Sequence, residues 1–345
     1  MRKGEGANKG GNLKEIVLHL LKQRIDQPVS GGELAAKLVV SRTAVWKAVN
    51  ALRAEGYLIT GTPRRGYQLS SHSDLILPGE IKAGLSTAVL GRRVEYRVKV
   101  TSTNTLARQL AEEGAEEGTV VLAEEQTAGR GRRGSTWFSP PRQGIWLSVL
   151  LRPQLSPLWA PYFTMAAALA ALRAVQQAAG PEVPAGIKWP NDLLLRGRKV
   201  GGVLCEVAAE PDLLRYVVAG IGINVRQAEE DFPPALRAHS TSLFRETGRL
   251  CLRAPVIRQL LRELEDLYLR LKQGRQEEVR ALYSSHCLTL GQEVEVRREG
   301  GAEPLSGRAE AIGSDGALLI RTAEGRSLPV YAGEVSLRRP GGGYA

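Results

Sequence analysis

The stretch Gln126-Thr-Ala-Gly-Arg-Gly-Arg-Arg-Gly-Ser-Thr-Trp137 decides most of what the sequence indicates about fold and function. Three arginines stand among three glycines, so the segment is cationic and its backbone is conformationally free. Guanidinium groups and backbone N–H groups both bind phosphate oxygens. The composition predicts a loop that closes over an anionic ligand; a solvated basic turn or a nucleic-acid contact is the alternative.

The glycine spacing also fits two nucleotide-binding motifs, but the context excludes both. Gly129 to Gly134 satisfies G-x-G-x-x-G, yet the Thr-Trp-Phe-Ser-Pro-Pro that follows at 136–141 cannot open the helix that a dinucleotide fingerprint requires. A P-loop needs a phosphate-binding lysine after its last glycine, and this loop has Ser135 there. We therefore expect neither a dinucleotide-binding fold nor a P-loop NTPase.

Two predicted strand ends supply further polar groups. The stretch Gly186-Ile-Lys-Trp-Pro-Asn-Asp192 places a cation, a carboxamide and a carboxylate at one strand end, where α+β enzymes often bind ligands. The strand Ala219-Gly-Ile-Gly-Ile-Asn-Val225 has glycines that allow close backbone approach and an asparagine that can donate to a ligand. An ordinary turn and a glycine bulge remain the alternatives.

The surrounding segment predicts a mixed sheet with helices. Its predicted strands are 94–100, 119–123, 144–151, 187–189, 193–195, 200–207 and 214–223, and its predicted helices are 103–113 and 158–179. The run 144–151 is almost continuously apolar, which predicts a strand covered on both faces. Together these elements predict an α+β layer in which helices back the sheet on one side.

The N-terminal segment has the pattern of a winged helix-turn-helix. Apolar residues recur at helical spacing from Leu13 to Leu21, a short helix follows at 32–38, and Ser41 is an N-cap before a third helix over 42–55. Residues 57–69 alternate around a Pro/Gly turn and predict a hairpin. Residues 1–72 hold 12 Lys and Arg against 5 Asp and Glu, so +7 of the chain's net charge of +11 lies here.

Basic and polar side chains lie off the apolar stripe of the third helix and at the hairpin tip. They suit phosphate contacts and base-edge hydrogen bonds in a major groove. The predicted DNA-binding residues are Arg42, Thr43, Trp46, Lys47, Asn50, Arg64 and Arg65. The alternative is a small helical domain with a solvated basic face; helix order, the capped third helix and the localised charge favour DNA.

The C-terminal segment predicts two helices and then a small β-domain. The helices are predicted over 255–273 and 275–286, and short strands over 293–298, 305–312, 317–322 and 326–331 suggest an SH3-like β-barrel. The predicted organisation is a disordered leader (1–12), a winged helix-turn-helix (13–70), a central ligand-binding domain (71–286) and the barrel (287–340). The tail from Arg338 is expected to be disordered.

Composition limits the class of protein. With 345 residues and 43% hydrophobic content the chain has material for two or three packed domains, which excludes a disordered or fibrous chain. Cys205, Cys251 and Cys287 are widely separated and favour a reducing compartment over a disulfide framework. There is no signal-peptide core, and the most apolar stretch, 165–175, is shorter than the roughly 20 residues that cross a bilayer. We expect a cytoplasmic protein without a membrane span.

The ordered set of motifs resembles that of biotin protein ligases. The set comprises Ser102-Thr103-Asn104, Gln126 with the loop Gly129–Gly134, Lys188–Asp192, Lys199–Gly202 and Gly220–Asn224. With its N-terminal segment, the chain resembles the bifunctional biotin ligase and biotin operon repressor over nearly its whole length. The resemblance implies the class II synthetase-like biotin ligase fold. The family loop commonly has an arginine where this chain has Ser135, so one phosphate-facing or loop-ordering cation is missing.

The resemblance implies two half-reactions. The biotin carboxylate attacks the α-phosphate of ATP, with Mg²⁺ countering the remaining phosphate charge, and gives biotinyl-5′-AMP and pyrophosphate. A lysine of the biotin carboxyl carrier protein then attacks the adenylate and gives an amide and AMP. The first step brings two anions together, so positioning and charge stabilisation should carry catalysis. Also implied is a homodimer that forms when adenylate is bound and represses transcription at operator DNA.

The resemblance assigns residues to both ligands. The implied biotin-binding residues are Ser102, Thr103, Asn104, Gln126, Arg130, Gly131, Arg132 and Lys188. The implied ATP- or adenylate-binding residues are Arg130, Arg132, Arg133, Trp137, Asn191, Asp192 and Asn224. Lys188 and Arg132 are the implied catalytic residues, since Lys188 would bridge the two reacting anions and the loop would shield the adenylate from water. Asp192 is the implied Mg²⁺ ligand.

Two other functions stay open from the sequence. One is a transcriptional regulator that senses a small ligand without turnover, against which Lys188 and the glycine-arginine loop argue. The other is a lipoate-type ligase, a related acyl-adenylating class, against which the same loop and the Lys-Trp-Pro-Asn-Asp motif argue. Whether the C-terminal barrel contacts ATP or the carrier is also left open.

Overall fold

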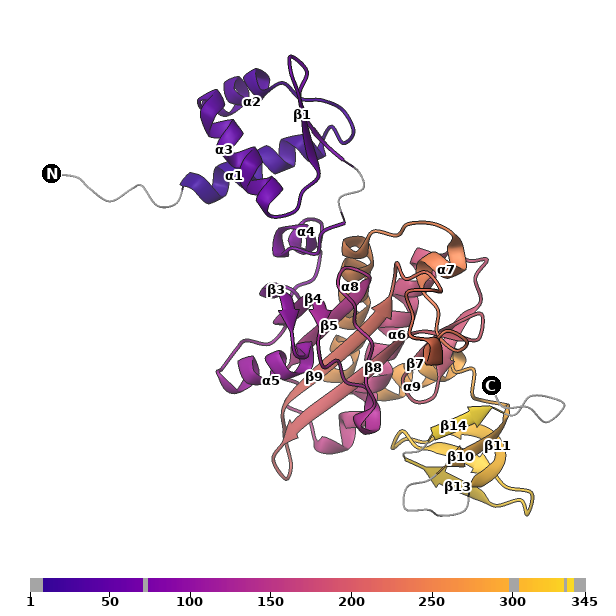
Figure 1. Cartoon of the computed structure of the whole chain (residues 1–345). Coiled ribbons are helices and arrows are strands. Elements are labelled where there is room, and N and C mark those ends of the chain that lie inside the picture. Colours follow the sequence, from indigo (N-terminus) through magenta and orange to yellow (C-terminus); the bar gives the residue numbers. More distant parts are fainter. Residues whose placement is uncertain (1–8, 71–73, 298–303, 332–333, 338–345) are drawn as a thin grey trace. The chain divides into compact units, whose positions relative to one another are not determined.

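The computed structural model describes residues 9–70, 74–297, 304–331 and 334–337 (Figure 1). The chain divides into two units, Met1–Leu75 and Ile76–Ala345. Residues 1–8 of the predicted leader and the predicted tail from Arg338 lie outside the described residues.

The N-terminal unit consists of three helices and an antiparallel hairpin. The helices are α1 (Lys9–Lys22), α2 (Gly31–Leu38) and α3 (Arg42–Ala54), and the hairpin strands are β1 (Ile59–Thr62) and β2 (Gly66–Leu69). Ser30 and Ser41 cap α2 and α3 with their side-chain oxygens. The helix-turn-helix with its wing is therefore present. Helix α1 begins inside the stretch 1–12 expected as leader, because the first turn of a helix needs no apolar stripe.

The second unit is built on a seven-stranded mixed sheet. Its strands are β3 (Val94–Val100), β4 (Val120–Gln126), β5 (Gly144–Leu151), β6 (Ala185–Lys188), β7 (Asp192–Leu195), β8 (Arg198–Ala209) and β9 (Leu214–Asn224). The spatial order is β3-β4-β5-β9-β8-β7-β6, with β3 and β4 parallel and the other neighbours antiparallel. The predicted strands and the hairpin between 193 and 207 are thus confirmed.

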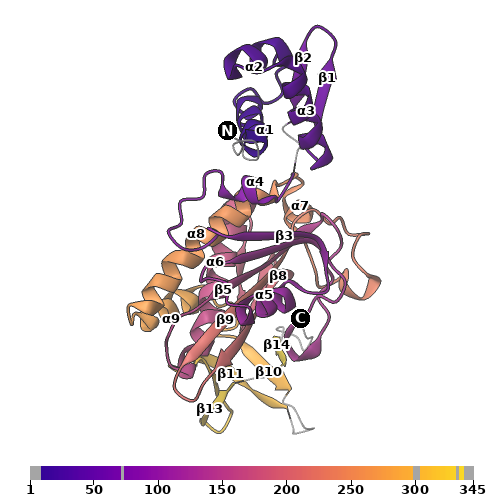
Figure 2. The same ribbon diagram turned by 90° about the vertical axis from the view of Figure 1, so that its left-hand side faces the viewer.

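Helices cover both faces of this sheet. The helices α6 (Ala160–Ala179), α8 (Arg253–Lys272) and α9 (Gln276–Ser285) pack on one face, and α5 (Thr103–Glu112) packs on the other (Figure 2). The two faces alternate along β4, since Leu122 packs with the first group and Val121 with α5. The expectation of helices on one side only was wrong, because α5 covers the second face. Strand β5 is buried throughout, as predicted.

The apolar helix α6 is the centre of the core. The stretch Pro157–Ala179 is long and apolar enough, by length and composition, to cross a membrane, but 67% of its apolar window is buried inside the protein. That burial is typical of a core helix. The pattern did not predict the short helices α4 (Pro78–Lys82) and α7 (Leu243–Thr247), which Pro78 and Ser242 begin.

The second unit ends in a five-stranded antiparallel sheet. The strands are β10 (Glu293–Arg297), β11 (Leu305–Ile312), β12 (Leu318–Arg321), β13 (Ser327–Val330) and β14 (Glu334–Leu337), in the order β13-β12-β11-β10-β14. The sequence pattern predicted the first four and missed β14. This sheet touches the central domain, since the Trp189 indole donates to the Gly316 carbonyl (3.3 Å) and the Tyr162 hydroxyl donates to the Ser314 carbonyl.

Candidate active site

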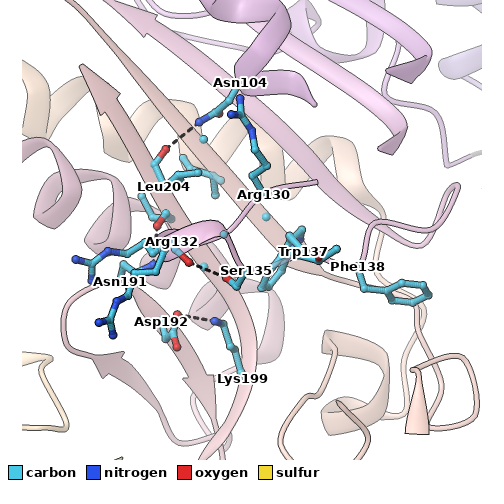
Figure 3. Close-up of a pocket in the computed structure, with 18 of the residues that line it drawn as sticks. Asn104, Arg130, Arg132, Ser135, Trp137, Phe138, Asn191, Asp192, Lys199 and Leu204 are labelled. Atoms are coloured by element: carbon cyan, nitrogen blue, oxygen red, sulfur yellow. Dashed lines mark hydrogen bonds and ion pairs between the residues drawn. The ribbon is translucent and has the colours of Figure 1, made fainter. Parts of the chain in front are cut away.

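A cavity of about 820 Å³ lies on the face of the central sheet that α5 packs against, where Leu204 of β8 and Gly220 and Gly222 of β9 line it (Figure 3). Residues far apart in the sequence meet there because the strand register places Lys188, Asp192, Gly202 and Gly222 in one row across β6, β7, β8 and β9. The residues assigned to biotin or ATP from the sequence all line it: Ser102, Thr103, Asn104, Gln126, Arg130, Gly131, Arg132, Arg133, Trp137, Lys188, Asn191, Asp192 and Asn224. The structure therefore brings the predicted ligand residues into one site.

One wall of the cavity is polar and already hydrogen-bonded. The Gln126 side-chain oxygen accepts from the Thr103 backbone N–H (2.8 Å) and hydroxyl (3.1 Å). Ser148, on β5, places its hydroxyl 2.8 Å from the Thr103 hydroxyl and 2.6 Å from the Asn104 side-chain oxygen. Ser102, Thr103 and Asn104 are buried at the start of α5. This fixed set of donors and acceptors suits a small neutral polar ring.

The glycine-arginine loop is folded into a tight turn. The Gly131 N–H donates to the Ser135 carbonyl (2.7 Å), and the Ser135 N–H (3.1 Å) and hydroxyl (2.9 Å) donate to the Arg132 carbonyl. Arg133 at the turn has a φ of 58°. Ser135 therefore closes the turn through its own hydroxyl. This is the position where the family loop commonly has an arginine.

Two arginines of this loop point to different walls (Figure 3). Arg130 donates to the Thr105 hydroxyl (2.8 Å) on α5. Arg132 donates to the side-chain oxygen of Asn191 (3.5 Å), and the side-chain nitrogen of Asn191 donates to the Val203 carbonyl (2.7 Å). Burial lowers the pKa of the Arg132 guanidinium, and Asp192 opposes that shift. A partly desolvated guanidinium interacts strongly with an incoming anion, because water screens it less.

The cation and carboxylate of the Lys-Trp-Pro-Asn-Asp motif face each other across a hairpin. Lys188 at the end of β6 lies opposite Asp192 at the start of β7 in the strand register. The Asp192 carboxylate forms an ion pair with the Lys199 ammonium on β8, with 2.6 Å between Oδ1 and Nζ. The motif's tryptophan, Trp189, is buried, and its backbone N–H donates to the Thr289 hydroxyl (2.9 Å). Trp189 thus anchors the strand end, while Lys188 and Asp192 line the cavity.

Trp137 forms another part of the wall. Its indole lies against Gly222 and meets Trp146 edge-on, with ring centroids 6.5 Å apart. The Lys199 ammonium lies 5.3 Å from its ring centroid. The Trp137 indole nitrogen is buried and has no hydrogen-bond partner among the described residues.

Asn224 lines the cavity but its carboxamide is engaged within the protein. Its nitrogen donates to the Thr241 carbonyl (3.0 Å), and its oxygen accepts from Gln227 (3.2 Å). The side chain therefore holds the 225–242 connection against β9. The predicted nucleotide contact of Asn224 would therefore use its second amide hydrogen or the second lone pair of its oxygen.

Several lining residues were not predicted. Lys199 belongs to the Lys199–Gly202 motif, which was the available signal for it. Phe232, Leu236 and Ser240 come from the connection between β9 and α7. Phe232 is buried there, and its aromatic side chain in a connection without periodic pattern was the available signal in the sequence.

The described part of the chain gives little support for a metal site made of protein ligands alone. No cluster of three or more His, Cys, Asp or Glu side chains that could hold a metal occurs among these residues. Asp192 is the carboxylate among the cavity-lining residues. Mg²⁺ in nucleotide sites often takes one or two carboxylates, with phosphates and water as its other ligands, so Asp192 fits that limited role.

The predicted DNA-binding residues lie on the surface of the N-terminal unit. Arg42, Thr43, Trp46 and Lys47 are exposed on α3, and Arg64 and Arg65 are exposed between β1 and β2. Asn50 is half-buried and accepts from Arg53 (3.3 Å), whose guanidinium also donates to the Ile59 carbonyl (2.8 Å). Arg53 thereby ties α3 to the wing. The face remains basic and solvent-accessible.

Comparisons with known proteins cover all three parts of the chain. Residues 94–224 match the biotin/lipoate A/B protein ligase family, 13–68 an HTH domain, and 289–338 the biotin protein ligase C-terminal domain. A bifunctional ligase/repressor BirA of Bacillus spizizenii is 37% identical over 94% of this chain and 98% of its own length. A biotin–[acetyl-CoA-carboxylase] ligase of Mycobacterium tuberculosis is 37% identical over 71% of this chain and 88% of its own.

Solved structures agree. The biotin protein ligase of Aquifex aeolicus, in complex with biotin and ATP, covers 72% of this chain and 99% of its own length, with a TM-score of 0.60 and 30% identity.

Proposed function

Because the chain belongs to the biotin protein ligase family, we propose that its cavity joins biotin to the AMP part of ATP, with release of pyrophosphate, and passes the biotin to a lysine of a biotin carboxyl carrier protein, with release of AMP. The chain is a biotin protein ligase with a helix-turn-helix repressor domain, and its small-molecule ligands are biotin and ATP. The observation that supports the residue roles is the single cavity, in which a fixed polar wall lies beside Lys188 and a cationic loop.

Biotin would bind with its ureido ring on the polar wall. Ser102, Thr103, Asn104 and Gln126 would contact the ring, which both donates and accepts hydrogen bonds. The biotin carboxylate would then lie toward Lys188. Lys188 would hold this carboxylate against the α-phosphate of ATP and offset their mutual repulsion as biotinyl-5′-AMP forms and pyrophosphate leaves.

The glycine-arginine loop would cover the adenylate. Arg130 and Arg132 would neutralise phosphate charge, with Arg133 at the outer turn, and Gly131 would allow the backbone to approach the ligand. Exclusion of water protects the mixed anhydride until the carrier lysine attacks its carbonyl carbon and AMP leaves. No covalent enzyme intermediate is needed.

The nucleotide would occupy the side of the cavity lined by Trp137. The indole face suits an adenine ring, and Asn191 and Asn224 lie nearby. Asp192 would hold Mg²⁺ together with the ATP phosphates, and the bound ion would supply positive charge to the phosphates. Lys199 is then available to either Asp192 or phosphate.

The repressor activity would depend on assembly. We propose a homodimer when adenylate is bound, so that two copies of α3 read the two halves of a two-fold operator. The DNA contacts would come from Arg42, Thr43, Trp46, Lys47, Asn50, Arg64 and Arg65. A cytoplasmic location is consistent with the three free cysteines. Light scattering with and without biotinyl-5′-AMP tests the dimer, and an unchanged mass would contradict it.

The deciding experiment is incubation with biotin, Mg²⁺-ATP and an acceptor carrier domain, followed by mass measurement of the carrier. We expect a gain equal to one biotin minus water; a gain only with lipoate, or none, would overturn the ligase proposal. Lys188→Ala should reduce pyrophosphate release by about 100-fold or more with an unchanged melting temperature. Unchanged pyrophosphate release would remove Lys188 from its role.

A further inference from the structure

Glu206, on β8, touches the biotin wall from outside the cavity. It is not one of the cavity-lining residues, and its side chain is 24% exposed. Its carboxylate accepts from the Asn104 amide nitrogen at 2.7 Å and faces the guanidinium groups of Arg108 (3.3 Å) and Arg130 (3.9 Å). One carboxylate thus connects a predicted biotin-binding side chain, α5 and the glycine-arginine loop.

The Asn104 carboxamide has its two ends in different surroundings. Its nitrogen donates both hydrogens, to the Leu204 carbonyl (3.2 Å) and to Glu206 (2.7 Å). Its oxygen lies 2.6 Å from the Ser148 hydroxyl and close to Gly220, where an added Cβ would come within 2.1 Å. The oxygen keeps one lone pair for a ligand, so Asn104 can only accept from the ligand.

We propose that Glu206 is a positioning residue that sets the orientation of the Asn104 carboxamide and so makes it an acceptor for a ligand N–H group. The inference rests on the proposed function, in which that N–H belongs to the ureido ring of biotin. Without the carboxylate, the Leu204 carbonyl is the remaining acceptor for the amide nitrogen, so the amide rotates by half a turn more readily and then presents its own N–H to the ureido N–H. Two donors then face each other, and binding weakens.

The contact with Asn104 outweighs the contacts with the arginines. Asn104 is 4% exposed, and a buried amide that loses a charged acceptor is costly. The side chains of Arg108 and Arg130 are 50% and 42% exposed, and ion pairs at such positions contribute little. The effect of Glu206 should therefore appear in biotin affinity and only weakly in loop closure.

The test measures biotin binding by the full-length protein with isothermal calorimetry. Glu206→Met removes the acceptor at similar volume and should weaken biotin binding by about 10- to 100-fold, with the KM for ATP unchanged. Glu206→Gln restores an acceptor and should recover most of that affinity. Arg108→Met is the matched control, since it removes a side chain that pairs with Glu206 and is not one of the hydrogen-bond partners of the Asn104 carboxamide, and it should change the affinity less than threefold.

A double-mutant cycle separates positioning from a general structural effect. If Glu206 acts through Asn104, adding Glu206→Met to Asn104→Ala should cause no further loss of biotin affinity. Additive losses, or a Glu206→Met protein that binds biotin like wild type, would overturn the inference. Should Glu206→Met fail to fold, Glu206→Thr, which suits a strand, replaces it in the cycle. A wild-type protein that binds no biotin would instead contradict the proposed function.

Discussion

At the scale of single residues, two glycines of β9 lie under different parts of the cavity. A Cβ at Gly220 would come within 2.1 Å of the Asn104 side-chain oxygen, and one at Gly222 within 2.4 Å of the Trp137 indole nitrogen. We predict that Gly220→Ala raises the KM for biotin and Gly222→Ala the KM for ATP, each by about tenfold or more, since overpacking costs about 1–3 kcal/mol.

Steady-state kinetics with each substrate varied separately measures this selectivity. Gly79→Ala is the control, because a Cβ there meets no atom within 4 Å, and it should leave both KM values unchanged. If both β9 variants raised the same KM, the division of the cavity between a biotin wall and a nucleotide wall would be wrong.

Val39 is a strained residue in the turn between α2 and α3. It has φ 54° and ψ 45°, and it is 91% exposed. A β-branched side chain in this left-handed region costs roughly 1–2 kcal/mol. Val39→Asn should therefore raise the free energy of unfolding of the N-terminal unit by about 1 kcal/mol, measured by urea titration. Val39→Thr keeps the branch and should change little; equal stabilities of the two variants would show that the turn is not strained.

The sequence predicted which residues line the site better than it predicted what each does there. The loop arginines and Lys188 were found because charge and glycine spacing are visible in the chain, whereas Asn104 was found through the resemblance of its motif to that of the ligase family. The engagement of Asn224 with Thr241 and Gln227 was not, because it depends on the path of a connection without periodic pattern. Glu206 was missed for the same reason, since its partner Asn104 is 102 residues away.

At the scale of elements, a buried ion pair ties α8 to the central sheet. Arg253, which is fully buried at the start of α8, reaches the Glu124 carboxylate on β4 (2.6 Å) and the Gly144 carbonyl at the start of β5 (3.2 Å). Arg253→Met should lower the free energy of unfolding by about 3–5 kcal/mol, because it leaves a buried carboxylate without its cation.

Denaturant unfolding of the single and double variants tests whether the unpaired Glu124 carboxylate causes the loss of stability. Adding Glu124→Leu to Arg253→Met should recover part of the loss, since replacing a whole buried pair by apolar residues is often neutral. A double variant less stable than Arg253→Met would contradict the argument. The sequence pattern could not show this pair, because the predicted helix began at Pro255 and left Arg253 outside it.

The hairpin formed by β1 and β2 presents two exposed arginines, Arg64 and Arg65, at its turn. Arg64→Ala together with Arg65→Ala should weaken DNA binding and lower the slope of log affinity against log salt by up to about 2, since each phosphate contact contributes about 0.9. Fluorescence anisotropy over a salt series measures the slope, and carrier biotinylation by the same variant should be unchanged. An equal loss of biotinylation would contradict the division of labour between the two units.

At the scale of the whole molecule, the C-terminal sheet is more than an appendage to the catalytic domain. Its turn at 313–316 receives hydrogen bonds from Trp189, adjacent to Lys188, and from Tyr162 on α6. Arg280 on α9 also donates to the Ile312 carbonyl (2.7 Å). The alternation of apolar and polar residues predicted the strands but not their docking, because contacts between segments far apart in the sequence leave no local signal. The docking joins the turn after β6 to a second domain.

Tyr162 makes this docking sensitive to alkaline pH. Burial, with Glu277 adding to it, raises the pKa of the Tyr162 hydroxyl from 10.0 to about 12. The unfolded chain therefore loses this proton first, so the contribution of Tyr162 to stability is constant below about pH 10 and falls between pH 10 and 12. A shift of this size corresponds to roughly 2–3 kcal/mol. Tyr162→Phe should accordingly show a shallower loss of unfolding free energy from pH 9.5 to 11.5 in urea titrations, although other buried tyrosines continue to titrate. Parallel pH profiles for the two proteins would show that the hydroxyl does not hold its proton at the domain contact.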